Sequence, residues 1–237
     1  VLADMMRDLG IRVRPEQVLV TTGAQQALTL IAEAFIDPDD IIITEGPTYL
    51  GALQAFSAFE PDVRAIPFDE DGMRMDLLEE ELKRIGKDNP RLKFCYTIPN
   101  FQNPGGVTMT AERRRRLLEL AHEYNFMVVE DDPYGRLRYD GGHQVPLKAM
   151  DDSVIYLGTI SKMLGPGLRT GWTAAPEAVL ARINLVKQGA DLCGSAFDQL
   201  IVQHYFADVA WQRTLQKFIA LYKERRDAML AALDEFF

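Results

Sequence analysis

Short apolar segments alternate with longer amphipathic segments along almost the whole chain. Ile41–Thr44 and Phe94–Ile98 are apolar at consecutive positions, as in strands that are buried on both faces. Ala24–Phe35 instead places its apolar residues three or four positions apart, which is typical of a helix with one buried face. Buried strands joined by such helices predict a mainly parallel sheet covered by helices on both sides.

The same reading extends over the rest of the chain. Strands are predicted at Gln17–Thr21, Ile41–Thr44, Asp62–Ile66, Phe94–Ile98, Phe126–Glu130, Val154–Gly158 and Gly171–Ala175. Helices are predicted at Ala24–Phe35, from about Pro47, and at Leu77–Ile85, Ala111–Tyr124, Glu177–Gln188, Phe197–Phe206 and from Val209 onward. We therefore expect an α/β fold of three αβα layers around a mainly parallel mixed sheet, with residues 1–237 as one domain.

The two ends of the chain resemble the interior of a protein. The first ten residues, VLADMMRDLG, are typical of the middle of an amphipathic helix. The predicted last helix continues from Val209 without a Gly or Asn that would end it. We expect the chain to be a piece of a longer protein.

Composition narrows the classes of function. The chain has 26 Lys and Arg against 35 Asp and Glu, a net charge of −9, which argues against a surface for nucleic acid or for an anionic membrane. Apolar runs fall short of the roughly 18 residues of a membrane span. Cys95 and Cys193 belong to no CxxC pair, and with only three His no zinc-type cluster is expected. Two lone thiols favour the cytoplasm.

A run of four arginines, Arg113–Arg116, is the one local feature that suggests nucleic acid. Leu117, Leu118, Leu120 and Ala121 follow it and provide the buried face of the same predicted helix. We interpret the run as the solvated first half of that helix, since one run in an acidic chain is a weak signal.

The clearest candidate chemistry follows the strand VIYLG. Thr159, Ser161 and Lys162 stand at its end, and Arg169 follows in the glycine-rich segment GPGLRTGW. A Lys here is by itself also compatible with the start of an ordinary loop. Two hydroxyl groups, a second cation and a glycine-rich turn together predict a phosphate-binding site.

Three further strand ends carry polar residues. Asp131 and Asp132 are compatible with metal ligands, general bases or turn residues, and Asn103–Gly106 with a tight turn. Thr22–Gln26 lies between a strand and a helix start, where free backbone N–H groups bind phosphate. Because the carboxyl ends of parallel strands meet at one edge of a sheet, these groups predict one ligand site.

Six segments, in this order and spacing, resemble fold-type I pyridoxal-phosphate aminotransferases of class I/II. These are TTGAQQAL, EGPTYLGALQAF, IPNFQNPGG, VVEDDPYGRL, YLGTISKMLGPGLRTGW and KQGADL. The resemblance is strongest to the 2-aminoadipate and kynurenine aminotransferase-like branch and covers nearly all of the chain. It implies the large domain, which binds pyridoxal 5′-phosphate. The N-terminal segment and most of the C-terminal small domain have no counterpart here.

The resemblance also implies a role for each matched residue. Lys162 matches the Schiff-base lysine, which also moves the proton during catalysis, and Asp131 matches the acid that keeps the pyridine nitrogen protonated. Tyr134 and Asn103 match the groups that hydrogen-bond the 3′ oxygen, and Tyr49 matches the aromatic residue stacked on the ring.

The remaining matches complete the cofactor site. Pro133 is implied to pack on the second face of the ring. The phosphate is implied to be held by Gly23, Ala24, Gln25, Thr159, Ser161 and Arg169. Asp132 is interpreted as a turn residue beside the catalytic acid.

The function implied is a ping-pong aminotransferase. It moves the amino group of 2-aminoadipate or of an aromatic or large aliphatic amino acid to a 2-oxo acid, with 2-oxoglutarate the expected acceptor. A homodimer is implied. The Arg that the small domain provides for the substrate α-carboxylate has no convincing replacement here. Two alternatives stay open: an aminotransferase-like effector domain of a GntR-type transcription regulator, and a lyase or decarboxylase on the same fold.

Overall fold

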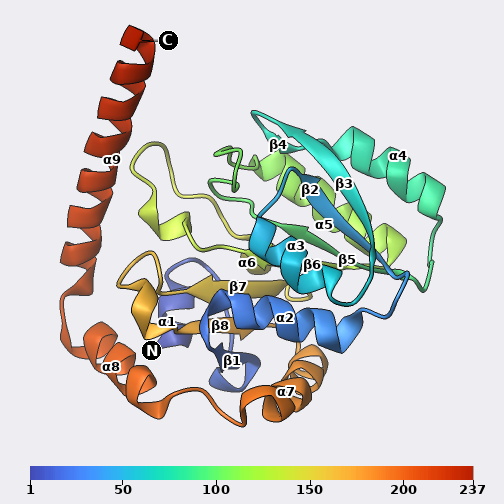
Figure 1. The fold of residues 1–237 in the computed structure, drawn as a ribbon, viewed down its shortest axis with the longest axis horizontal. Coiled ribbons are helices and arrows are strands. Elements are labelled where there is room, and N and C mark those ends of the chain that lie inside the picture. The colour runs from blue at the N-terminus through green and yellow to red at the C-terminus, as the bar shows by residue number, and fades with distance from the viewer. Residues whose placement is uncertain (237) are drawn as a thin grey trace.

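An eight-stranded mixed sheet lies between layers of helices in the computed structural model, which describes residues 1–236 (Figure 1). Its order is β1-β8-β7-β6-β5-β2-β3-β4. The strands are β1 (Val18–Thr21), β2 (Ile41–Gly46), β3 (Asp62–Asp69), β4 (Gly72–Met73), β5 (Leu92–Thr97), β6 (Met127–Asp131), β7 (Ile155–Thr159) and β8 (Gly171–Ala174). β4 and β8 run antiparallel to the other six strands of this sheet, so the predicted mainly parallel mixed sheet is confirmed.

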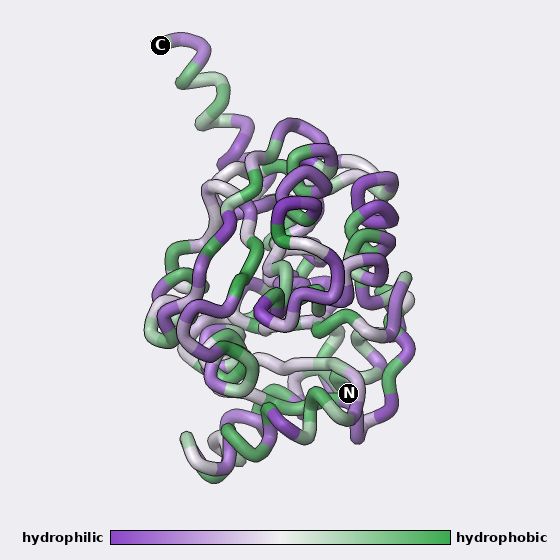
Figure 2. The backbone as a smooth tube through the Cα atoms, turned by 90° about the vertical axis from the view of Figure 1, so that its right-hand side faces the viewer, coloured by the Kyte–Doolittle hydropathy of each residue, from purple (hydrophilic) through white to green (hydrophobic). Residues whose placement is uncertain are grey.

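Helices cover both faces of the sheet. They are α1 (Leu2–Arg7), α2 (Gly23–Phe35), α3 (Leu50–Ser57), α4 (Met75–Ile85), α5 (Ala111–Tyr124), α6 (Leu147–Met150), α7 (Glu177–Asp191), α8 (Ala196–Asp208) and α9 (Trp211–Phe236). Figure 2 shows hydrophobic and hydrophilic residues alternating along the outer helices. The expected αβα layering is therefore confirmed.

Consecutive residues of the central strands face different cores. Ile42 packs with α2, α3 and α7 on one face, whereas Ile43 packs with α4 and α5 on the other. A third core joins α1, α8 and the start of α9 to Tyr156 and Trp172 of β7 and β8. This two-sided burial explains why the strands are apolar at consecutive positions rather than at alternate ones.

The start of α3 differs from the prediction. The helix begins at Leu50 rather than near Pro47, because Tyr49 has an extended backbone with ψ of 119°. Pro47–Tyr49 therefore form a loop after β2, and this loop holds the Tyr49 side chain at the carboxyl edge of the sheet. The short β4 and α6 were not predicted, since two and four residues are too few to show a period.

The interpretation of the arginine run as solvated is wrong at one position. Arg114 is 1% exposed and donates hydrogen bonds to the carbonyls of Met109 and Pro99 and to Oδ1 of Asn100. Its guanidinium also lies 3.9 Å from buried Glu130. Arg114 faces the sheet from the first turn of α5, and these acceptors satisfy the hydrogen bonds that its guanidinium loses on leaving water. Arg115, one residue later, is exposed.

We predict that Arg114→Met destabilises the fold by about 3–5 kcal/mol, because it leaves Glu130 and four acceptors, the carbonyl of Val145 among them, without their partner. Arg115→Met, the same change one residue later on the exposed face, should alter the free energy of unfolding by less than about 0.5 kcal/mol. Urea unfolding followed by circular dichroism measures both values. Equal effects from the two variants would contradict this assignment.

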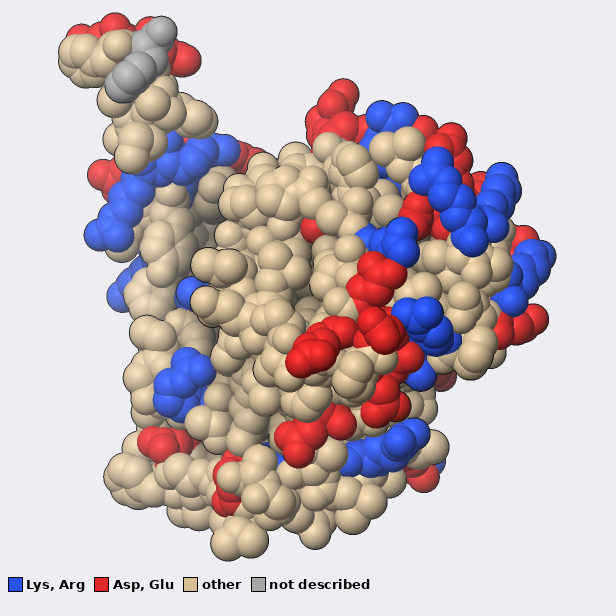
Figure 3. All heavy atoms as spheres, turned by 45° about the vertical axis from the view of Figure 1, so that its right-hand side comes forward, with Lys and Arg blue, Asp and Glu red and all other residues tan. Residues whose placement is uncertain are grey.

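Charged side chains of both signs are interspersed on the face shown in Figure 3, most densely towards α4. Ion pairs on and beside α4 join Lys83 to Glu79 at 2.8 Å and Arg64 to Glu81 at 3.0 Å. The two charges within each pair neutralise one another, and such exposed ion pairs contribute little to the stability of the fold.

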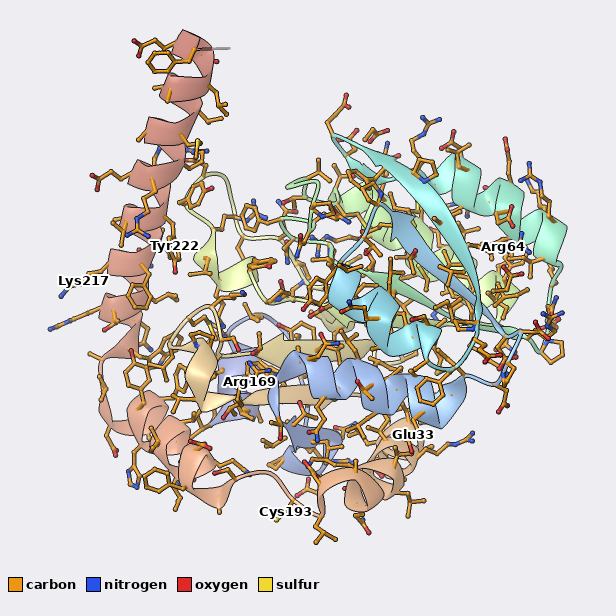
Figure 4. The ribbon with its side chains drawn as sticks, viewed as in Figure 1. Glu33, Arg64, Arg169, Cys193, Lys217 and Tyr222 are labelled. Carbon is orange, nitrogen blue, oxygen red and sulfur yellow. The ribbon has the colours of Figure 1, made fainter. Side chains whose placement is uncertain are left out.

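The long helix α9 stands beside the body of the molecule (Figure 1). Trp211 and Leu215, in the first turns of α9, are buried against the body. Further along the helix, Arg226 forms an ion pair with Asp140 at 2.6 Å. Tyr222 points towards the body, while Lys217 points away from it (Figure 4). Within the described part of the chain, α9 and the other helices are too short or too polar to cross a membrane.

Candidate active site

A cavity of about 220 Å³ opens at the carboxyl edge of the parallel strands. It is lined by Ala24, Gln25, Leu28, Tyr49, Ile98, Asn103, Asp131, Pro133, Tyr134, Thr159, Ser161, Lys162, Pro166 and Arg169. Of the twelve residues predicted from the sequence, all but Gly23 line this cavity. Segments up to 145 positions apart in the chain therefore meet here, as expected for an open α/β sheet.

The register of β8 with its neighbours builds one end of the cavity. Gly171 pairs with both Thr21 and Thr159, which brings the start of α2 next to the end of β7. A Cβ on Gly171 would lie 2.6 Å from the backbone of Gly23, so only glycine permits this approach. The close packing places Arg169 against the first turn of α2 (Figure 4).

Gly23 lies behind this end of the cavity rather than in its lining. Its φ is +75°, and a Cβ there would lie 2.3 Å from Nη2 of Arg169. The free N–H groups of the first turn of α2, the Arg169 guanidinium and the hydroxyls of Thr159 and Ser161, whose oxygens are 3.0 Å apart, all belong to this end. Such a set of donors binds a phosphate group.

Tyr49 is held over the cavity by a contact with α2. Its hydroxyl donates to Oε1 of Gln25 at 3.2 Å, and Nε2 of Gln25 donates to the carbonyl of Gly51 at 2.7 Å. A Cβ on Gly51 would lie 2.5 Å from the Tyr49 ring, so a larger residue at position 51 would clash with the ring in this position. A fixed aromatic face of this kind is suited to stacking on a planar ligand.

Asp131 ends β6 at the floor of the cavity. It is 4% exposed, and Oδ2 accepts a hydrogen bond of 2.9 Å from the hydroxyl of Tyr96. Burial raises the pKa of Asp131 to about 7, the Tyr96 hydrogen bond lowers it, and the charge of Asp132 raises it. A positively charged partner in the cavity would stabilise the carboxylate form.

Lys162 and Tyr134 lie next to each other on the loops that follow β7 and β6. The ammonium of Lys162 lies 6.0 Å from the centre of the Tyr134 ring, and its side chain is exposed. Burial raises the pKa of the Tyr134 phenol and Asp131 raises it further, whereas a hydrogen bond with Asn103 lowers it. The phenol therefore stays protonated and available as a donor.

Asp132 lies in the turn after β6, as interpreted, but it is also a buried hydrogen-bond acceptor, which the sequence interpretation did not include. Its carboxylate is 8% exposed and accepts three hydrogen bonds, from Nδ2 of Asn100 at 2.9 Å, from N of Gly135 at 3.0 Å and from the hydroxyl of Tyr156 at 3.1 Å. Successive residues of a strand point to opposite faces, so Asp131 faces the cavity and Asp132 faces the core beneath it. Asp132 thereby holds the turn that carries Tyr134.

A buried acid that the sequence reasoning missed supports the loop with Asn103. Glu45 accepts hydrogen bonds from Oγ1 of Thr97 at 2.6 Å and from Nε2 of Gln102 at 3.2 Å. Gln102 also donates to the carbonyl of Pro47 and accepts from N of Gly105. Glu45 and Gln102 thus tie the loop after β2 to the loop after β5.

Three residues of the lining were also missed: Leu28, Ile98 and Pro166. Leu28 stands one helical turn after Gln25, so the helical period was a signal that could have placed it on the same face. Tyr96 was missed as well. A tyrosine inside an apolar strand needs a hydrogen-bond partner for its hydroxyl, and this requirement was the available signal.

A second cavity of about 410 Å³ adjoins the first and shares Tyr134 and Lys162 with it. Phe101, Tyr139 and Tyr222 form its aromatic walls, with Tyr222 contributed by α9. Phe101 and Tyr139 are stacked with their ring centres 6.3 Å apart. The space beside Lys162 is therefore largely apolar.

The sequence pattern of one family, described as aminotransferase class I and II, matches residues 2–236. The chain belongs to this family. Its members depend on pyridoxal 5′-phosphate, as the resemblance in the six segments implied.

Individual aminotransferases show how far the similarity extends. The chain is 50% identical to the aromatic-amino-acid aminotransferase 1 of Thermococcus litoralis, over 99% of this chain and 57% of that protein. It is 41% identical to the 2-aminoadipate transaminase of Thermus thermophilus, over 94% of this chain and 56% of that protein. A crystal structure of an archaeal alanine:glyoxylate aminotransferase superimposes with a TM-score of 0.94 at 41% identity, over 99% of this chain and 59% of that one. The chain spans little more than half of each relative.

The chain is also similar to a protein named as a transcription regulator. The chain is 34% identical to the uncharacterized HTH-type transcriptional regulator YisV of Bacillus subtilis, over 99% of this chain and 48% of that protein. This identity is lower than the 50% and 41% to the two aminotransferases above.

The cavity fits the cofactor of the family. Oδ1 of Asp131 is buried and has no hydrogen-bond partner among residues 1–236, and Asp131 is one of the residues that line the cavity. A protonated pyridine nitrogen is the kind of donor that would satisfy it. At the other end, the absence of a Cβ on Gly23 leaves room for Arg169 beside the first turn of α2.

Proposed function

We propose that the protein is a pyridoxal-phosphate-dependent aminotransferase with a ping-pong reaction. It moves the amino group of 2-aminoadipate, an aromatic or a large aliphatic amino acid to a 2-oxo acid, with 2-oxoglutarate as the expected acceptor. One observation carries the proposal: Lys162, Asp131, Tyr134 and Arg169 line a single cavity in a chain of this family. The apolar cavity next to Lys162 supports a large donor side chain.

When bound, pyridoxal phosphate supplies a protonated ring that withdraws electrons from the substrate Cα. Asp131 holds the proton on the ring nitrogen. Lys162 would hold the cofactor through its amine, and the same amine is the group that would move the proton of the substrate Cα. Tyr134 and Asn103 hydrogen-bond the ring oxygen.

The other residues of the cavity bind and orient the cofactor. Tyr49 and Pro133 pack on the two faces of the ring. The phosphate is held by Gly23, Ala24, Gln25, Thr159, Ser161 and Arg169. These contacts would hold the cofactor beside Lys162, and positioning of this kind accelerates a reaction.

Residues 1–237 form the cofactor-binding large domain in this proposal. An Arg outside this chain binds the substrate α-carboxylate. The length of the relatives supports this, since the chain covers 57% of the Thermococcus litoralis enzyme. We place the protein in the cytoplasm, which the free thiols of Cys95 and Cys193 support.

The donor class is tested by mixing the protein, with pyridoxal phosphate bound, with single amino acids and following formation of pyridoxamine phosphate by absorbance. We expect 2-aminoadipate or a large apolar amino acid to react at least about tenfold faster than aspartate or alanine, because a well-filled apolar pocket discriminates by that amount. A preference for aspartate or alanine would contradict the donor class. Cofactor binding without turnover of any donor would favour the regulator alternative.

We also expect the protein to be a homodimer, since closed symmetric dimers are the commonest assemblies of soluble proteins. Large apolar side chains exposed on and beside α7 and α8 support this: Leu185 is 69% exposed, Leu192 84% and Phe197 73%. Sedimentation equilibrium should give twice the mass of one chain. A monomer that retains transaminase activity would contradict it.

A further inference from the structure

The two oxygens of the Asp131 carboxylate have different surroundings. Oδ2 accepts the hydrogen bond from Tyr96, at 2.9 Å. Oδ1 is buried without a hydrogen-bond partner among the described residues. One oxygen is thus anchored to the protein, and the other remains free to accept a hydrogen bond from a ligand.

Tyr96 is itself held firmly. It is fully buried in β5, pairs with Thr44 of β2 and Val129 of β6, and packs edge-on against Phe56 with ring centres 5.5 Å apart. Burial and the neighbouring carboxylate of Asp131 raise the pKa of its hydroxyl well above the usual value, so the hydroxyl keeps its proton. In this position it donates to Asp131.

We propose that Tyr96 is a positioning residue for the cofactor: its hydroxyl anchors Oδ2 of Asp131 and thereby presents Oδ1 to the pyridine nitrogen. The inference rests on the proposed function, because it needs a pyridine ring in the cavity. Tyr96 lies behind Asp131 and does not line the cavity, so it acts only through that carboxylate.

The chain contains a matched control. Tyr156 of β7 is also buried, and its hydroxyl donates to Oδ2 of Asp132 at 3.1 Å. Tyr156→Phe therefore removes the same atom, from a similar environment, on the neighbouring acid that faces away from the cavity. A merely structural contribution of Tyr96 would appear equally in Tyr156→Phe.

The test compares two ligands. Pyridoxal 5′-phosphate and its 1-deaza analogue, in which a C–H group replaces the ring nitrogen, are titrated into the cofactor-free wild type, Tyr96→Phe and Tyr156→Phe. Tyr96→Phe should weaken pyridoxal phosphate roughly tenfold and the analogue less than about twofold, since losing the hydrogen bond that positions Asp131 affects only a ligand whose ring nitrogen contacts that carboxylate. Tyr156→Phe should change the two dissociation constants by equal factors.

The outcomes separate the inference from the proposed function. Equal weakening of both ligands by Tyr96→Phe, or the same ligand discrimination in both variants, overturns the inference. Failure of the wild type to bind pyridoxal phosphate overturns the proposed function instead. In an Asp131→Asn background, Tyr96→Phe should have no further effect on the affinity ratio, and a persisting tenfold effect also overturns the inference.

If Tyr96→Phe does not fold, a ¹⁹F NMR measurement on protein that keeps the Tyr96 hydroxyl tests the same inference. Incorporation of 3-fluorotyrosine at position 96 keeps the hydroxyl and nearly the same size. Its ¹⁹F resonance should shift more on binding pyridoxal phosphate than on binding the 1-deaza analogue, because only the former changes the charge at Asp131. Equal shifts overturn the inference.

Discussion

Lys162→Ala should abolish transamination, with a fall in kcat of roughly 10⁴-fold or more, because one side chain provides both the covalent attachment of the cofactor and the proton carrier. Lys162 is placed for both roles by β7, which ends at Thr159 three residues earlier and delivers the lysine to the cavity. The visible absorbance of the protein with pyridoxal phosphate should be lost with it.

Borohydride reduction gives an independent measurement of the attachment. Peptide mapping of the reduced wild type should find the label on Lys162. Lys217→Ala serves as control, since this exposed side chain points away from the body of the molecule (Figure 4) and should leave activity unchanged. A label on another lysine would show that the attachment site is wrong.

Asp131→Asn should lower kcat by about 10²–10³-fold, the usual cost of removing one electrostatic group from an active site, while leaving the fold intact. The amide still accepts the hydrogen bond from Tyr96 and removes a costly buried charge. The free energy of unfolding of the cofactor-free protein should therefore change by less than about 1 kcal/mol. Steady-state kinetics and urea unfolding measure the two effects.

Asp132→Asn should show the opposite pattern. Its carboxylate accepts from Asn100, Gly135 and Tyr156, and an amide group would turn a donor towards one of them. We expect a loss of about 1–3 kcal/mol of stability and a kcat, per folded molecule, within about tenfold of the wild type. Equal losses of kcat in both variants would mean that the partner of the ring nitrogen is misassigned.

Local pattern was sufficient for most of the fold. Ala111–Tyr124 was predicted with the bounds that α5 has, and the strands were found within a few residues, because buried strands and amphipathic helices carry their period in the sequence itself. The start of α3 was misplaced because Pro47 also suits a helix start, whereas the extended backbone of Tyr49 depends on contacts with α2 and Gly51.

The candidate site was predicted mainly through the resemblance to a family, supported by polar residues at four strand ends. The pattern alone left Asp131 and Asp132 equivalent. The alternating faces of β6 distinguish them, because one acid faces the cavity and the other faces Tyr156 in the core. Arg114 and Arg115 differ in helical position, because Arg114 shares the face of Leu117, Leu118 and Ala121, but only the structure shows the acceptors that satisfy a buried guanidinium there.

The sequence by itself determined the elements, their order and the chemical groups available at the carboxyl edge of the sheet, since these depend on interactions between residues close in the chain. The tertiary structure alone decided which polar groups are paired. Tyr96 and Asp131 are 35 positions apart, and Gly23 and Arg169 are 146 apart; each pair meets only because strand order and register bring it together. Burial then makes each such pairing matter, because a polar group removed from water must find its partner inside the protein.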